Sequence, residues 1–176
     1  MSSIQIQKNN IVHMNTDCIV NAANSYLLAG GGVCGAIFHH AGYDQLTKAC
    51  QAIGYCPTGD AVITPGFQLK STYIIHAVGP KWQGGHHQED QLLYSCYQKA
   101  LDLALKNHCH SIAFPLISSG IYGYPIKQAW QIAICSCIDF IDHHPYDIDI
   151  IFTVIDNQME ELGNVVMNEH YQDKIH

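Results

Sequence analysis

The chain of 176 residues contains no arginine, and its eight basic residues are all lysines. With 15 acidic residues, its formal net charge is −7 when the histidines are neutral. Nucleic-acid binders cluster lysine and arginine to contact phosphates, so this composition disfavours a nucleic-acid partner. It also excludes the bidentate guanidinium contact with phosphate. Any phosphate ligand must therefore be held mainly by backbone N–H groups in turns and at helix N-termini.

Long apolar runs are missing as well. No stretch of about 18 apolar residues occurs, so we expect no membrane span and no membrane partner. The chain starts directly with an alternating pattern at residues 4–7, without the basic and apolar regions of a signal peptide. Eight cysteines in such a chain favour a reducing environment. We therefore expect a cytoplasmic protein whose cysteines are mostly small buried hydrophobes.

Several functional motifs are absent from the sequence. It has no C-x-x-C pair and no H-E-x-x-H, so we expect no metal and no cofactor. The adjacent histidines at 39–40, 86–87 and 143–144 are interpreted as loop or helix-surface residues. Neither G-x-G-x-x-G with an acidic residue about 20 positions on nor G-x-x-x-x-G-K-[ST] is present. A dinucleotide redox fold and an NTPase are therefore disfavoured.

What is present is an ordered series of strand and helix patterns. Period-two or short apolar runs predict strands at 4–7, 18–22, 60–64, 71–78, 112–115 and 148–155. Longer patterns with glycine, proline or aspartate at their ends predict helices at 33–41, 43–53, 90–108, 125–144 and from 156 or 157 to about 172. Because strands alternate with helices, we predict one α/β domain over residues 1–176. Its sheet should be largely parallel, with helices on both faces.

Two of the predicted strand-to-helix junctions are rich in glycine. One reads NAANSYLLAGGGVCG at residues 21–35, and the other reads ISSGIYGYP at residues 117–125. Ligands of open α/β sheets bind outside the carboxyl ends of strands, and glycine lets the backbone approach a ligand closely. Each loop leads into a helix N-terminus, where an anionic contact contributes about 0.3–1 kcal/mol. We expect the two loops to clamp a diphosphate; the alternative is that the glycines only permit tight turns.

These loops stand in a series of motifs that resembles a macro domain. The series consists of VNAAN at 20–24, GGGVCGAI at 30–37, CPTGDA at 56–61, HAVGP at 76–80 and the loop at 118–125. Its order and spacing are similar to the MacroD-type branch, which includes bacterial O-acetyl-ADP-ribose deacetylases. The resemblance implies a three-layer α/β/α domain with a mixed, mostly parallel central sheet that binds ADP-ribose. Many members hydrolyse ADP-ribose from acidic side chains, or hydrolyse its O-acetyl ester, without a metal.

The resemblance also implies the residues of the site. Asn24 matches the asparagine that contacts the distal ribose, and the Tyr122 ring can shield that ribose from water. The alternatives are that Asn24 only holds a turn and that Tyr122 only packs. The expected catalytic positions are Asn24 and Cys34, and the expected ligand-binding residues are Asn10, Ile11, Ala22, Asn24, Gly31, Gly32, Val33, Ser118, Ser119, Gly120, Ile121, Tyr122 and Ile155.

Cys34 departs from the family pattern, which usually has an aspartate there to activate or orient water. A free thiol has a pKa near 8.5, so it is mostly neutral at pH 7 and a poor general base. General base catalysis is worth about 10²–10⁴-fold in rate. Simple loss of the base is therefore our main interpretation. A cysteine nucleophile and water activation by the substrate's own phosphate remain as alternatives.

The adenine end departs from the pattern too. Asn10 replaces an aspartate that accepts a hydrogen bond from adenine, and a neutral bond contributes only about 0.5–1.5 kcal/mol. Ile155 replaces an aromatic residue whose stacking is worth about 1–3 kcal/mol. Phe38 and His39 replace His and Arg, with a consequence that the sequence does not reveal. We expect adenine binding to be weakened but retained.

The sequence therefore predicts recognition of ADP-ribose or of an ADP-ribosylated protein, with impaired hydrolysis. The alternative is an active ADP-ribosyl hydrolase or O-acetyl-ADP-ribose deacetylase, which would use Asn24 and substrate-assisted water activation. A third hypothesis, an RNA-binding module, is disfavoured by the net charge of −7.

Overall fold

In the computed structural model, which describes the backbone of residues 1–175 and the side chains of residues 1–170, six strands form one sheet. Their order across the sheet is β1-β6-β5-β2-β4-β3. Only the pairing of β3 with β4 is antiparallel; the other four pairings are parallel. The predicted mixed, mostly parallel sheet is confirmed. The strands are β1 (Ser3–Lys8), β2 (Cys18–Ala22), β3 (Ala61–Pro65), β4 (Tyr73–Ala77), β5 (Ser111–Phe114) and β6 (Asp149–Val154).

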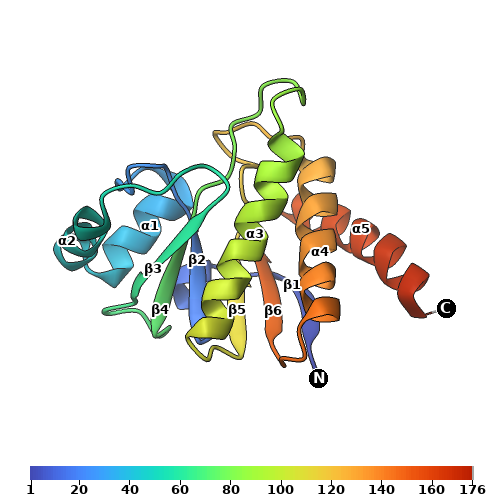
Figure 1. Ribbon diagram of the computed structural model, residues 1–176, viewed down its shortest axis with the longest axis horizontal. Coiled ribbons are helices and arrows are strands. Elements are labelled where there is room, and N and C mark those ends of the chain that lie inside the picture. The colour runs from blue at the N-terminus through green and yellow to red at the C-terminus, as the bar shows by residue number, and fades with distance from the viewer. Residues whose placement is uncertain (176) are drawn as a thin grey trace.

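Helices cover both faces of this sheet. Neighbouring strand residues point to opposite faces, so Ile75 packs with α3 and α4 on one face, and Ile74 packs with α1 and α2 on the other. Figure 1 shows α3 and α4 side by side, with α1 and α2 across the sheet from them. The predicted three-layer arrangement is confirmed. The helices are η1 (Ile11–His13), α1 (Gly32–Ala41), α2 (Tyr43–Ile53), α3 (Glu89–Lys106), α4 (Ile126–His143) and α5 (Asn157–Ile175).

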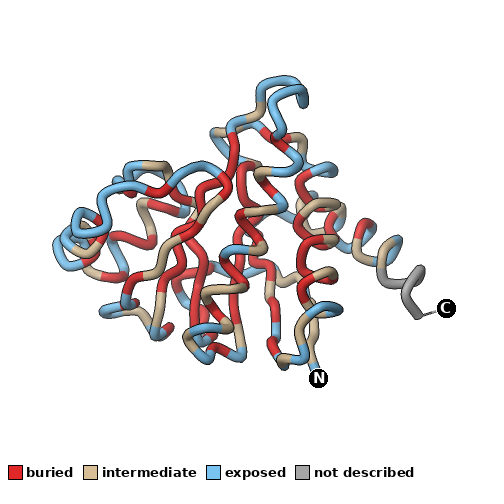
Figure 2. The backbone as a smooth tube through the Cα atoms, in the orientation of Figure 1, coloured by how far each residue is buried: buried red, intermediate tan, exposed pale blue. Residues whose placement is uncertain are grey.

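The interior consists of apolar strand residues and the inward faces of the helices. Figure 2 shows buried backbone running through the strands, while the connecting loops are largely exposed. On the α3–α4 side the aromatic rings of Tyr97, Phe114, Trp130 and Phe152 pack together. Within the described chain, no helix has both the length and the apolar character needed to cross a membrane.

Some sequence expectations about the elements are wrong. Strands and helices do not alternate throughout, because β3 and β4 form an antiparallel hairpin with no helix between them. The expected cap of the last helix is confirmed at the first of its two candidates, since the Asp156 carboxylate accepts hydrogen bonds from the N–H groups of Gln158 (2.7 Å) and Met159 (3.2 Å). Pro125 precedes α4 as its N-cap instead of starting it. Helix α1 starts at Gly32, one residue earlier than predicted.

The strand order determines which loops become neighbours. Strands β1, β6, β5, β2 and β4 are mutually parallel, so their carboxyl ends lie along one edge of the sheet. Along this edge lie, in order, the loops that follow β1, β6, β5, β2 and β4. The two glycine-rich loops follow β5 and β2 and are therefore adjacent.

Candidate functional site

The structure brings the predicted site residues to this one edge of the sheet. Asn10 and Ile11 follow β1, and Ile155 follows β6. The loop at residues 115–125 follows β5, and the segment at 23–31 follows β2 and leads into α1. Residues predicted for the adenine end are thus separated from Asn24 by the loop predicted to bind phosphate. An extended ligand with adenine at one end, a diphosphate in the middle and the distal ribose at the other end would need this order.

The start of α1 offers unused backbone donors. The first N–H groups of a helix have no partner within the helix, and Gly31, the N-cap residue, provides no side-chain cap. Gly31, Gly32 and Val33 are all exposed. Gly32 has φ +59°, a conformation that favours glycine. Gly32, expected just before the helix, and Val33, predicted as its first residue, both belong to the first turn, which increases their suitability for binding an anion.

Asn24 holds the turn that precedes this helix. Its side-chain oxygen accepts a hydrogen bond from Leu28 N (3.0 Å), and its amide nitrogen donates to Leu28 O (2.9 Å). An amide has a second lone pair and a second N–H, so these bonds leave capacity for a ligand hydroxyl. Asn24 also lines a cavity at this edge. Turn holding and the predicted ribose contact are therefore compatible.

The loop after β5 is held by its own backbone. Tyr124 N donates to Ser118 O (2.9 Å), and Gly123 N donates to Gly120 O (3.0 Å). None of these bonds uses the N–H groups of residues 120–122. Ser118 is buried with φ +68°, and its hydroxyl has no hydrogen-bond partner among the described residues. The loop thus presents a second set of donors beside the start of α1.

Cys34 lies at the end of a chain of buried polar side chains. Its thiol donates to Leu28 O (3.7 Å) and accepts a hydrogen bond from the Asn21 side-chain amide (3.6 Å). The same amide nitrogen lies 3.1 Å from His76 Nδ1, and His76 Nε2 lies 3.0 Å from Thr64 Oγ1. Burial lowers the pKa of His76 to about 4, so this ring is neutral at pH 7. The chain therefore links Cys34 to a neutral histidine.

Tyr122 connects the two glycine-rich loops to the loop after β4. Burial raises the pKa of its hydroxyl, and the nearby Cys34 raises it further. Lys81 places its ammonium 5.6 Å from the centre of the Tyr122 ring. Trp82 N donates to Tyr122 O at 2.8 Å. Tyr122 is thus held between its own loop and the chain after β4.

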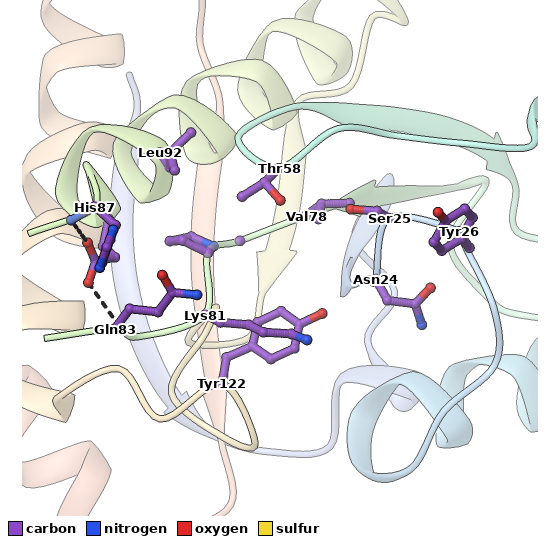
Figure 3. A pocket seen from close by; sticks show the side chains of 13 residues that line it. Asn24, Ser25, Tyr26, Thr58, Val78, Lys81, Gln83, His87, Leu92 and Tyr122 are labelled. Carbon is purple, nitrogen blue, oxygen red and sulfur yellow. Dashed lines mark hydrogen bonds between the residues drawn. The ribbon is translucent and has the colours of Figure 1, made fainter. Parts of the chain in front are cut away.

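A cavity of about 450 Å³ opens on this side of the site. Figure 3 shows Asn24 and Tyr26 toward one end of it and Gln83 and His87 toward the other. Of the predicted site residues only Asn24 and Tyr122 line it. Three residues of the HAVGP motif at 76–80 line this cavity, but the sequence analysis assigned that motif no role in the site. The cavity is lined by Asn24, Ser25, Tyr26, Thr58, Val78, Gly79, Pro80, Lys81, Gln83, His87, Glu89, Leu92 and Tyr122.

The adenine end of the edge is open. Asn10 caps η1 by accepting a hydrogen bond from Val12 N (3.3 Å), and its side-chain oxygen has a second lone pair for a ligand. Ile11 is buried, whereas the Ile155 side chain is 78% exposed. Ile155 thus presents an apolar surface without an aromatic ring.

Comparison with known proteins identifies the family. A family model described as "Macro domain" matches residues 20–133. The chain belongs to the macro domain family. This macro domain is 55% identical over 127 residues to the macro domain-containing protein CT2219 of Chlorobaculum tepidum, covering 72% of this chain and 73% of that protein. It is 46% identical over 165 residues to an O-acetyl-ADP-ribose deacetylase of Salmonella newport, covering 92% of each.

Solved macrodomains have the same fold. The Oceanobacillus iheyensis macrodomain with ADP matches this macro domain with a TM-score of 0.89 and 39% identity, covering 96% of this chain and 91% of that one. Three other structures of that protein each carry one substitution. The substituted residues are an asparagine, a glycine seven positions after it and an aspartate ten positions after it. Here Gly31 and Cys34 follow Asn24 at the same two intervals.

Proposed function

We propose that this macro domain binds ADP-ribose, either free or attached to a protein. The observation that carries the proposal is the pairing of two sets of backbone donors at the adjacent ends of β2 and β5. One set is the uncapped start of α1, and the other is residues 120–122. Such donors can bind a diphosphate in a chain that has no arginine.

The remaining site residues suit the two ends of this ligand. Asn24 has hydrogen-bonding capacity left for a ribose hydroxyl, and Tyr122 stands beside it at the cavity. Asn10 and the exposed Ile155 lie where the adenine would be. The macrodomain of Oceanobacillus iheyensis, which matches this fold, has been solved with ADP and with ADPR. This supports the same ligand class here.

Calorimetry with a pair of variants tests the role of the backbone donors. Val33→Pro removes one N–H from the first turn of α1, where proline is tolerated, and Val33→Ala keeps that N–H. Because hydrogen bonds to charged groups contribute about 1.5–3 kcal/mol, we expect Val33→Pro to weaken ADP-ribose binding at least about tenfold. Val33→Ala should stay within a few-fold of wild type. No heat from the wild type at millimolar ADP-ribose would exclude the proposed function.

We infer further that hydrolysis is impaired in this protein, because Cys34 stands at the position of the usual aspartate. Its thiol is bonded to Leu28 and Asn21, and the nearest histidine in that chain, His76, has its ring nitrogens directed to Asn21 and Thr64. An active hydrolase is the second candidate, which the similarity to an O-acetyl-ADP-ribose deacetylase favours. Release of ADP-ribose from a glutamate-modified protein distinguishes the two candidates.

A further inference from the structure

A second cavity lies between α3 and α4. It is a groove of about 410 Å³, and it shares no lining residue with the cavity after β4. The groove is therefore separate from the site proposed for ADP-ribose, and the proposed function does not use it. Its lining residues are Asp90, Gln91 and Tyr94 from α3 and Gln131, Ile132 and Cys135 from α4.

Cys135 is the nucleophilic group of this groove. The other seven cysteines are buried, whereas the Cys135 side chain is partly exposed. Among the described residues it is thus the exception to the expectation that the cysteines are small buried hydrophobes. A reagent dissolved in water reaches this thiol first, because the buried thiols become accessible only when the structure opens.

A histidine from the last helix lies beside the Cys135 thiol. Helix α5 packs against α4, as Figure 1 shows, and both ring nitrogens of His170 lie 3.8 Å from Cys135 Sγ. In either neutral tautomer one of these nitrogens carries no hydrogen, so the ring can accept the thiol proton. Because a thiol reacts as its thiolate, a proton acceptor at this position favours reaction of Cys135.

Carboxylates are the charged groups around the groove. Among the described residues that line it, only Asp90 is charged. Asp139 lies one helical turn after Cys135, and its carboxylate accepts a hydrogen bond from the Tyr94 hydroxyl (2.7 Å). That bond raises the pKa of Tyr94 to about 12, so the phenol is neutral at pH 7. A cationic reagent is therefore attracted to the groove, and an anionic reagent is repelled.

We propose that Cys135 is a site of reversible modification by small disulfides that carry an amino group. The Cys135 thiol transfers its proton to His170, and the sulfur attacks one sulfur of the disulfide. A new S–S bond forms to Cys135 while the S–S bond of the reagent breaks. The departing half takes up the proton and leaves as a thiol. Cys135 is thereby oxidised to a mixed disulfide, and the departing half of the reagent is reduced.

Three disulfides of similar size test the proposal on the folded, full-length chain. Cystamine is cationic, hydroxyethyl disulfide is neutral and dithiodipropionate is anionic. Mass spectrometry measures the rate of adduct formation, and peptide mapping locates the adduct. We expect one adduct per chain, on Cys135, that forms at least about tenfold faster with cystamine than with dithiodipropionate. Added salt should reduce this difference. Cys135→Ser should form no adduct on the same timescale.

Two variants separate the role of charge from that of proton transfer. Asp90→Asn should lower the ratio of the cystamine rate to the dithiodipropionate rate, while the rate with hydroxyethyl disulfide stays unchanged. Its amide oxygen can still accept the hydrogen bond that Tyr124 donates to Asp90. His170→Gln should slow all three reagents about tenfold or more and leave that ratio unchanged. Asp102→Asn in α3 and His143→Gln in α4 are the matched controls, and both should react as the wild type does.

Adducts spread over several cysteines would overturn the proposal. So would a rate of Cys135 modification that does not depend on reagent concentration, because reaction would then be limited by opening of the structure. Equal rates with the three disulfides would overturn the preference for an amino group, and a wild-type rate in His170→Gln would overturn the role of the histidine. A failure of ADP-ribose binding would refute the proposed function and leave this inference standing, because the groove and that site share no residue.

Discussion

A β-carbon placed on Gly79 would stand 2.3 Å from Ser118 Oγ and 2.5 Å from Ile117 Cγ2. The chain after β4 is therefore in direct contact with the start of the loop after β5. Ser118 itself has the unusual φ of +68°, and its carbonyl accepts the bond from Tyr124 N. The position of the predicted phosphate loop thus depends on a glycine in a different strand connection.

Gly79→Ala should displace that loop. The added methyl group requires Ser118 and Ile117 to move, and overpacking of this kind typically costs about 1–3 kcal/mol. We expect a free energy of unfolding lower by that amount and ADP-ribose affinity reduced about tenfold or more. Urea titration and calorimetry measure the two effects. Gly30→Ala is the stability control, since its β-carbon meets no atom within 4 Å. Wild-type affinity in Gly79→Ala would show that the loop does not depend on this contact.

Cys34→Asp should increase hydrolysis. The Asn21 amide, which lies 3.6 Å from the sulfur, can donate to a carboxylate at this position. A positioned general base is worth about 10²–10⁴-fold, so we expect ADP-ribose release from a glutamate-modified protein to rise at least about 10²-fold. Asn24→Ala in the same background should abolish the gain.

Cys34→Ala serves as the control for this experiment. It should retain whatever slow hydrolysis the wild type has, because the thiol is interpreted as taking no part in the chemistry. If Cys34→Ala abolishes that activity, a thiol mechanism replaces the interpretation. If Cys34→Asp does not increase the rate of ADP-ribose release, the missing general base is not the only reason why hydrolysis is impaired.

Glu89 should make stability sensitive to strong acid. Burial alone would raise its pKa, but backbone N–H groups at residues 83, 85 and 87 and its own lower the pKa to about 2, from an ordinary value of 4.5. The stabilisation is therefore complete above about pH 4.5 and is lost as the pH falls through 2. Glu89→Gln should be less stable at pH 7, with the difference from wild type shrinking toward pH 2. Urea titrations across this range measure it, and the exposed Glu161→Gln should show no such trend.

His76 should make protein stability depend on pH in a different range. Its pKa is about 4 in the folded protein and about 6.5 in the unfolded chain, so only the unfolded chain takes up a proton between these values. Stability should fall by roughly 3 kcal/mol as the pH drops from 6.5 to 4, and this contribution should level off below 4. His76→Gln should flatten the unfolding free energy over that window relative to wild type. A substitution of the exposed His108 should leave this pH dependence as it is in the wild type. If His76→Gln keeps the wild-type dependence of the unfolding free energy on pH, His76 is not its source.

The element pattern was readable from the sequence because it depends on local chemistry. Apolar periodicity located the six strands, and glycine and proline located most helix ends within one or two residues. The same local signals located both glycine-rich loops. The predicted alternation failed at β3 and β4, because the turn at residues 66–72 reverses the chain and lets the strands pair directly. The roles assigned to Asn24, Tyr122 and the other site residues stay predictions.

The sequence alone determined the order of the elements, the family and the absence of arginine as a phosphate ligand, since each follows from residues close together in the chain or from their count. Only the tertiary structure decided that Gly79 packs on Ser118, that Cys34 joins His76 through Asn21, and that Asn24 and Tyr122 line one cavity. These relationships join residues far apart in the chain, such as Asn21 and His76, which are 55 positions apart, and they depend on how parallel strands line up within the sheet. Local pattern contains no information on that alignment, because it arises from packing the whole core at once.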